Sequence, residues 1–156
     1  MNSIFWVFLG AATVHVVEEY KYPGGFLNTL KRLNPRFAPF ITVNFAFIVN
    51  ALFLLLCLVS VIVGEKNFGF SLSVASLLFL NALTHTVAMV STRRYSPGVI
   101  SGVLLYLPIS IYGYYYFLSS GLLSFPVGMV SFILGLLYQA APIAYLALSA
   151  KFAEAK

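Results

Sequence analysis

Residues 41–63 read ITVNFAFIVNALFLLLCLVSVIV, an apolar stretch without a charged side chain. A membrane-spanning helix needs about 20 mainly apolar residues, so this stretch predicts one. The composition of the whole chain agrees with this prediction, because 61% of the 156 residues are hydrophobic and only 8% are charged. Soluble domains average about 25% charged residues. The sequence therefore predicts an integral membrane protein and argues against a soluble globular fold.

Four further apolar segments are candidates for membrane spans: residues 4–19, 69–91, 98–117 and 126–149. Together the five segments predict an all-α, polytopic fold with five transmembrane helices in one domain, residues 1–156. The last segment is interrupted by Pro142. The N-terminus has no basic region and no evident cleavage site, so we expect the first segment to be retained rather than removed as a signal peptide.

The connection between the first two segments, residues 20–40, is too polar to span a membrane. Glycine and proline residues break the chain at both of its ends. Between these breaks, four apolar side chains fall on one helical face: Phe26, Leu27, Leu30 and Leu33. This pattern is typical of a short helix that lies in the membrane interface. We expect such a helix here, either as a plain connector or as a lid over a site beneath it.

Basic side chains are divided unequally between the two sides that five spans create. Two connections and the C-terminal tail hold eight of them: Lys21, Lys31, Arg32, Arg36, Arg93, Arg94, Lys151 and Lys156. The opposite side has only Lys66. Because basic residues concentrate in cytoplasmic loops, we expect a cell-membrane protein with its N-terminus outside and its C-terminus in the cytoplasm. The formal net charge of +5 then reflects contact with membrane lipids, and no nucleic-acid partner is expected.

The first segment ends in the run His15-Val16-Val17-Glu18-Glu19. On a helix, the spacing i, i+3, i+4 brings His15, Glu18 and Glu19 to one side. Ionisable groups at membrane depth are costly, and they usually mark a functional site. At about 100° per residue the two glutamates cannot both share the direction of His15 equally, so the sequence leaves open which one points inward.

Helix direction brings further polar residues to the same depth. The first and third segments both run toward the cytoplasm, and His85 lies near the end of the third, within about one turn of the depth of His15. Asn81 lies one turn deeper than His85 on the same face. Four side chains from the other segments are expected to line the same cavity and to contact a substrate: Asn44, Asn50, Tyr106 and Tyr145. The sequence thus predicts a polar cavity in the cytoplasmic half of the membrane.

Residues 93–98 read RRYSPG and connect the third segment to the fourth. The Ser-Pro pair is predicted to cap and start the fourth helix. The positive end of that helix, together with Arg93 and Arg94, favours an anion nearby. The anion is a lipid phosphate, a substrate carboxylate or one of the two glutamates. We therefore expect Arg93, Arg94 and Tyr95 to contact the substrate; the alternative is an ordinary basic loop with an interfacial aromatic residue.

Three motifs follow one another along most of the chain: His-x-x-Glu-Glu at residues 15–19, Asn-x-x-x-His at residues 81–85 and RRYSPG at residues 93–98. Together they resemble the HXXEE family of small membrane proteins. The resemblance implies that the polar residues of the first two motifs form one site, and it implies no reaction, because the family has no assigned activity. The expected catalytic group is His15, Glu18, Glu19, Asn81 and His85.

The first functional hypothesis is a membrane enzyme that acts on a lipid-like or hydrophobic substrate with one bound zinc or iron ion. Two histidines and a carboxylate are typical ligands of either metal, and His15, Glu18 and His85 are the expected ligands. Glu19 then serves as general base and Asn81 orients a ligand. Because the chain has only two histidines, a two-metal site is not expected.

Two further hypotheses need no metal. The same histidine and glutamate pair suits an acid–base isomerase, cyclase or epoxide-opening enzyme. A small proton-coupled carrier also places such groups in a helix bundle, although here the polar residues lie on one side and a carrier would require a dimer. The sequence favours an enzyme over a carrier. It leaves open the substrate, the metal and the oligomeric state, a homo-oligomer included.

Overall fold

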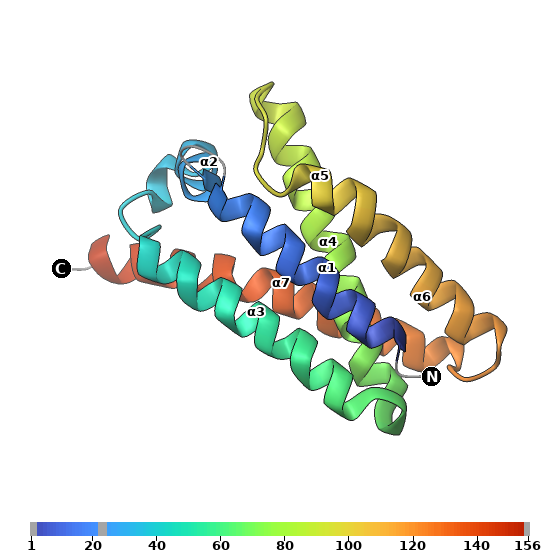
Figure 1. Cartoon of the computed structure of the whole chain (residues 1–156). Helices are drawn as coiled ribbons and strands as arrows, with labels where there is room; N and C mark the ends of the chain where they lie inside the picture. Colours follow the sequence, from blue (N-terminus) through green and yellow to red (C-terminus); the bar gives the residue numbers. More distant parts are fainter. Residues whose placement is uncertain (1–2, 22–24, 155–156) are drawn as a thin grey trace.

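The computed structural model describes residues 3–21 and 25–154, and the regular structure in these residues is entirely helical (Figure 1). The long helices are α1 (Ser3–Lys21), α3 (Val43–Val63), α4 (Phe68–Thr92), α6 (Leu107–Ser119) and α7 (Phe125–Glu154). The shorter elements are α2 (Gly25–Leu33), α5 (Val99–Ser101), the 3₁₀ turns η1 (Pro35–Phe37) and η2 (Gly64–Asn67), and the π-helix η3 (Gly102–Tyr106). The predicted all-α fold is confirmed, and the short helix predicted in the first connection is present as α2.

Three continuous helical stretches are long and apolar enough to cross a membrane: Val43–Thr92, Val99–Ser119 and Phe125–Glu154. The first of them consists of α3 and α4 joined by η2, and the second consists of α5, η3 and α6. Helix α1 is not among the three, and its last two turns carry the polar residues His15, Glu18 and Glu19. The chain therefore has the helices of a membrane protein.

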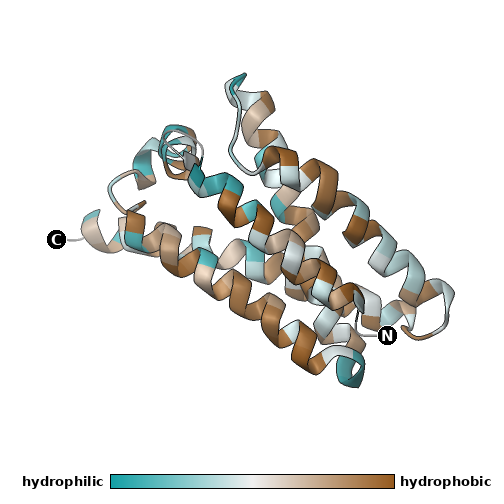
Figure 2. Cartoon of the chain, in the orientation of Figure 1, coloured by the Kyte–Doolittle hydropathy of each residue, from teal (hydrophilic) through white to brown (hydrophobic). Residues whose placement is uncertain are grey.

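The outward faces of the helices are apolar. Large side chains such as Phe47, Leu55, Ile62 and Val90 are more than half exposed. Figure 2 shows brown, hydrophobic residues along the helix bodies, while the teal, hydrophilic residues gather mainly at helix ends and connections. Soluble monomers rarely expose contiguous apolar patches above about 600 Å², whereas lipid tails favour such a surface.

Helix α4 lies at the centre of the bundle and contacts α1, α3, α6 and α7. Small residues allow the backbones to approach closely, as is common where membrane helices pack. A Cβ atom on Gly135 of α7 would lie 2.7 Å from the carbonyl oxygen of Ser73, and one on Gly102 would lie 3.2 Å from Cα of Ala82. This close packing holds α4 and its polar side chains in a fixed position against the neighbouring helices.

Side-chain caps begin two of the long helices, while α7 continues through a proline. Thr42 Oγ1 accepts a hydrogen bond from the backbone of Phe45 at the start of α3, and Asn67 caps α4 in the same way. The interruption suggested by Pro142 does not end α7. Proline has no backbone N–H, so the carbonyl of Tyr138, four residues earlier, lacks the helical hydrogen bond that it would otherwise accept. Both residues line a cavity of the bundle.

Two side-chain interactions join distant connections at the same end of the bundle. Arg36 of η1 donates to both carboxylate oxygens of Glu154, at the end of α7, at 3.0 Å each. Tyr95, which follows α4, donates to Glu18 near the end of α1. The basic connections and the end of α7 therefore lie at one end of the bundle, and Figure 1 places the start of α1 at the opposite end. Lys156 lies outside the described residues.

Candidate functional site

Three buried side chains from two helices meet at this end of the bundle. His15 and Glu19 lie on one face of α1 with the spacing i, i+4, and His85 comes from α4. Their exposed fractions are 1%, 5% and 0%, respectively. Oε1 of Glu19 lies 3.2 Å from Nε2 of His85 and 3.6 Å from Nε2 of His15. One ligand atom from each residue lies within 4.8 Å of the others.

The two imidazole Nε2 atoms are buried and form no hydrogen bond with any described residue. Nε2 of His15 lies beyond hydrogen-bond distance of Oε1 of Glu19, and Nε2 of His85 lies within that distance without forming a hydrogen bond. A tetrahedral zinc ion with bonds of about 2.0–2.2 Å holds its ligand atoms about 3.3 Å apart. The two separations from Oε1, 3.2 and 3.6 Å, are close to that spacing, and all three ligand atoms lie within 4.8 Å of one another. The three side chains are therefore a candidate site for one metal ion.

The opposite nitrogen of each histidine binds a buried serine. Nδ1 of His15 lies 2.9 Å from Oγ of Ser101, and Nδ1 of His85 lies 3.3 Å from Oγ of Ser96. Ser101 Oγ also lies 3.3 Å from the carbonyl oxygen of Gly98, so the same hydroxyl contacts both the loop and the His15 ring. Such hydrogen bonds orient histidine ligands in metal sites.

Neighbouring side chains hold the remaining parts of the cluster. Asn50 of α3 donates from Nδ2 to Oε2 of Glu19 at 2.9 Å, which leaves Oε1 for the histidines. The ring of Tyr106 stacks on His15 with centroids 4.5 Å apart, and the ring of Phe26 from α2 lies 4.3 Å from that of His85. Tyr106 belongs to the π-helix η3, an element often found at functional sites. Helix α2 thus covers one side of the site, as expected for the lid alternative.

Glu18 binds a different part of the chain. Its carboxylate accepts hydrogen bonds from the Tyr95 hydroxyl and from the backbone N–H groups of Gly98, Ile100 and Ser101. Backbone donors at the start of a helix favour an anion, and the anion here is Glu18 itself. The carboxylate therefore fastens residues 95–101 to α1. The same residues supply both serines that bind the histidines.

The predicted metal ligands His15, Glu18 and His85 need one correction. The structure brings Glu19, not Glu18, against the two histidines, because the turn of about 100° between adjacent helical residues points their side chains in different directions. The predicted Ser-Pro start of the fourth helix also differs from the structure. The helix begins at Val99 with Gly98 as N-cap, and Ser96 binds His85 instead.

Gly98 lies directly against both imidazole rings. A Cβ atom at this position would lie 2.7 Å from Cε1 of His15 and 2.7 Å from Cε1 of His85. Its φ of 97° also belongs to the left-handed region that favours glycine. The loop can approach the histidines this closely only because residue 98 has no side chain.

A cavity of about 680 Å³ adjoins the cluster and is lined by His15, by Pro39, Phe40 and Thr42 of the connection before α3, and by residues of α3, α4 and α7. Besides His15, four of the predicted substrate-contacting or catalytic residues line it: Asn44, Asn50, Asn81 and Tyr145. Oδ1 of Asn81 is buried and has no hydrogen-bond partner among the described residues. Five of the predicted residues therefore line one cavity, while Glu18, Glu19 and His85 are not part of its lining.

Four other predicted substrate contacts do not line this cavity. Tyr106 is fully buried against His15, and Tyr95 binds Glu18. Arg93 and Arg94 are exposed to solvent, and Arg93 ends α4 in a left-handed conformation with φ 52°. The two arginine side chains lie at the end of the bundle. The part of the loop that contacts Glu18 of α1 is its backbone N–H groups.

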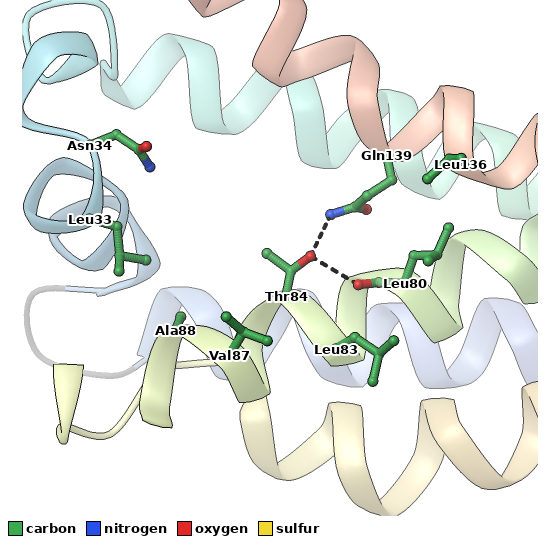
Figure 3. Close-up of a pocket in the computed structure, with 9 residues that line it drawn as sticks. All are labelled: Leu33, Asn34, Leu80, Leu83, Thr84, Val87, Ala88, Leu136 and Gln139. Atoms are coloured by element: carbon green, nitrogen blue, oxygen red, sulfur yellow. Dashed lines mark hydrogen bonds between the residues drawn. The ribbon is translucent and has the colours of Figure 1, made fainter. Parts of the chain in front are cut away.

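A second hollow of about 500 Å³ lies between α2, α4 and α7 (Figure 3). Its lining is mainly apolar, with Leu80, Leu83 and Leu136 among its side chains. Gln139 donates to Thr84 across it at 3.1 Å, and Gln139 also lines the larger cavity. The described residues that line the second hollow include no ionisable side chain, so it has no groups for acid–base or metal chemistry.

The sequence did not predict that three residues would contact the histidines: Ser96, Gly98 and Ser101. Ser96 and Gly98 belong to the RRYSPG motif, which indicated that residues 93–98 are important but did not predict these contacts. Ser101 carries no such signal, since serine is common where membrane helices pack.

Comparison with known proteins gives one match. The model of a family described as protein of unknown function with HXXEE motif matches residues 6–113. No match was found among the curated proteins or among the solved structures. The matched range contains His15, Glu18, Glu19, Asn81 and His85, and also the loop that binds them. The chain belongs to the HXXEE family of proteins of unknown function.

Proposed function

We propose that the chain crosses the cell membrane five times, through α1, α3, α4, the continuous helix of residues 99–119, and α7, with the N-terminus outside and the C-terminus in the cytoplasm. Helix α1 has 19 residues, enough to span most of a bilayer core. The Arg36–Glu154 and Tyr95–Glu18 contacts bring the basic connections to one end of the bundle. Because basic residues concentrate on the cytoplasmic side, this arrangement supports the proposed orientation. The buried cluster then lies near the cytoplasmic surface.

The proposed function is that of a membrane enzyme with one zinc or iron ion held by His15, His85 and Glu19. The observation that carries this proposal is the convergence on Oε1 of Glu19 of two buried Nε2 atoms that form no hydrogen bond with the described residues. Leaving buried polar atoms without hydrogen bonds is unfavourable, and a metal ion bound to Oε1 would also satisfy both Nε2 atoms. Two histidines and one carboxylate are a recurrent ligand set for zinc and for non-haem iron.

In this proposal the ion activates a water molecule or polarises a substrate oxygen. The chain supplies the environment: Ser101 and Ser96 hold the histidine rings, and Asn50 holds the carboxylate of Glu19. An ion held by these three residues would lie beside the large cavity, which His15 and Asn50 both line. Because most of the cavity lining is apolar, the substrate is a hydrophobic or lipid-like molecule that enters from the membrane.

The alternative is metal-free acid–base catalysis of an isomerisation, cyclisation or epoxide opening. The short separation of 3.2 Å between His85 Nε2 and Glu19 Oε1 favours it, since a proton can pass between such groups. The carrier hypothesis has less support. In the other half of the bundle, the hydroxyl of Tyr114 bonds to Ser76 and Ser131, so these polar groups satisfy one another.

Metal analysis of the purified protein tests the proposal. We expect about one zinc or iron ion per chain in the wild type, and none in His15→Ala or His85→Ala. Glu65→Gln, which changes a carboxylate in η2 far from the cluster, is the matched control and should retain the ion. A folded wild-type protein that purifies without metal and binds neither ion on titration would refute the metal centre and leave the acid–base alternative.

A further inference from the structure

We propose that the large cavity binds a single-chain lipid with an uncharged hydroxyl group, and that Oδ1 of Asn81 accepts the hydrogen bond from that hydroxyl. This inference rests on the proposed function, because it concerns the substrate of the same site. It adds the chemical class of the ligand, the atom that recognises it and the direction in which its chain lies.

Apart from His15, the polar side chains that line the cavity are uncharged, and they include four amides, from Asn44, Asn50, Asn81 and Gln139. Among the described residues of the lining, none is lysine, arginine, aspartate or glutamate. In the metal-free protein, a carboxylate or phosphate headgroup would therefore lose its hydration without gaining a lysine or arginine partner, which is unfavourable. The nearest carboxylate, that of Glu19, would also repel an anion.

Asn81 defines the polar end of the ligand. Asn81 lines the cavity, and its Oδ1 atom is buried and lacks a hydrogen-bond partner among the described residues. An amide oxygen only accepts hydrogen bonds, so a ligand must donate one to satisfy it. A hydroxyl can donate, whereas an ether, an ester or an alkane cannot. Asn81 lies one helical turn from His85, so this hydroxyl would lie beside the metal ligands.

The shape of the cavity favours one hydrocarbon chain. Its lining follows α3 from Thr42 to Leu56, a length of about 21 Å along the helix. A volume of about 680 Å³ over that length corresponds to a mean cross-section of about 30 Å², which is narrow for two chains side by side. Beyond Asn50 the lining is apolar, with Phe53, Leu56 and Leu77 at the deep end. The chain of the ligand lies along this apolar wall.

Competition binding with a matched set of dodecyl compounds tests the proposal. The protein is placed in phosphatidylcholine nanodiscs after treatment with a chelator, and tritiated dodecanol is displaced by unlabelled dodecanol, dodecyl methyl ether, dodecanoate or dodecyl phosphate. We expect dodecanol to compete at about tenfold lower concentration than the ether, which keeps the oxygen but cannot donate. The two anions should compete more weakly still.

Asn81→Leu, which keeps the volume and removes the acceptor, should weaken dodecanol binding about tenfold and abolish its advantage over the ether. Asn34→Leu, the same change in the lining of the second hollow, is the matched control and should bind as the wild type does. The ligand series on the wild type does not depend on whether the Asn81 variant folds.

Equal competition by dodecanol and its ether, or stronger competition by dodecanoate or dodecyl phosphate, would overturn the proposal. Because the measurement uses metal-free protein, its outcome is separate from that of the metal analysis. Selective dodecanol binding without a metal site would support this inference and refute the metal centre. A metal site without selective dodecanol binding would support the metal centre and refute this inference.

Discussion

Glu18 and Glu19 are neighbours in the chain, and their carboxylates hold two different parts of the site together. Glu19 faces the imidazoles of both histidines, whereas Glu18 binds the hydroxyl of Tyr95 and three backbone N–H groups of residues 98–101. One glutamate belongs to the candidate metal centre. The other positions the loop whose serines orient the histidines.

Replacing each glutamate by glutamine should separate these two roles. Glu19→Gln removes a charged ligand, so we expect it to abolish stoichiometric metal binding. Glu18→Gln keeps all ligands and weakens the attachment of residues 95–101, so it should retain one ion at saturation with an affinity about 10–100-fold lower. Isothermal titration with zinc measures both values. Equal losses in the two variants would contradict the division of roles.

Hydrogen exchange provides a readout of the Glu18 contact that does not depend on metal. The backbone N–H groups of Gly98, Ile100 and Ser101 donate to this carboxylate, so Glu18→Gln should speed their exchange. Exchange in α6, which Glu18 does not contact, should stay unchanged. Wild-type protection of residues 98–101 in the variant would show that other contacts hold the loop.

Gly98→Ala should disrupt the site by steric overlap. The added methyl group would lie 2.7 Å from Cε1 of both histidines, so we expect the metal affinity to fall at least about 100-fold. Gly121→Ala is the matched control, since Gly121 also has a positive φ, 70°, but has open space around its Cβ position. Both variants lose about 1–2 kcal/mol from backbone strain. Only Gly98→Ala should lose metal, and equal metal binding in both would argue against the contact.

Ser101→Ala should act on metal affinity through the His15 ring. Without the hydroxyl, Nδ1 of His15 loses its hydrogen-bond partner, and the ring loses the contact that orients it. We expect the zinc affinity to fall about 10–100-fold with little change in apparent melting temperature. Ser110→Ala is the matched control, because Ser110 Oγ is buried and forms no hydrogen bond with the part of the chain that the structure describes. If both variants bind zinc like the wild type, Ser101 has no orienting role.

Cysteine labelling tests the proposed topology. In a Cys57→Ser background, Lys66→Cys in η2 should react with a membrane-impermeant maleimide in intact cells. Lys151→Cys, at the other end of the bundle in α7, should react only after the membrane is permeabilised. Reaction of both positions from outside would contradict the five-span arrangement.

Most of the helical pattern follows from the sequence. The segment predicted at residues 41–63 is α3, Val43–Val63, and the segment at residues 69–91 is α4, Phe68–Thr92. The boundaries of these helices are predictable because long apolar runs, glycines and capping residues start and end a helix through interactions with nearby residues in the sequence. The passage of α7 through Pro142 is less predictable, since the neighbouring helices, and not the local chain, determine whether a proline ends a helix.

By itself, the sequence determined that the chain is an apolar helical protein and that His15, Asn81 and His85 lie at similar depths. These properties depend on composition and on the rise of about 1.5 Å per residue. Only the tertiary structure decided that Glu19 and not Glu18 joins the histidines, and that Ser101 and Gly98 contact them. Such contacts depend on how α1 and α4 are rotated about their axes and on the path of residues 95–101. Both arise from packing between distant segments, which the local pattern of a sequence does not contain.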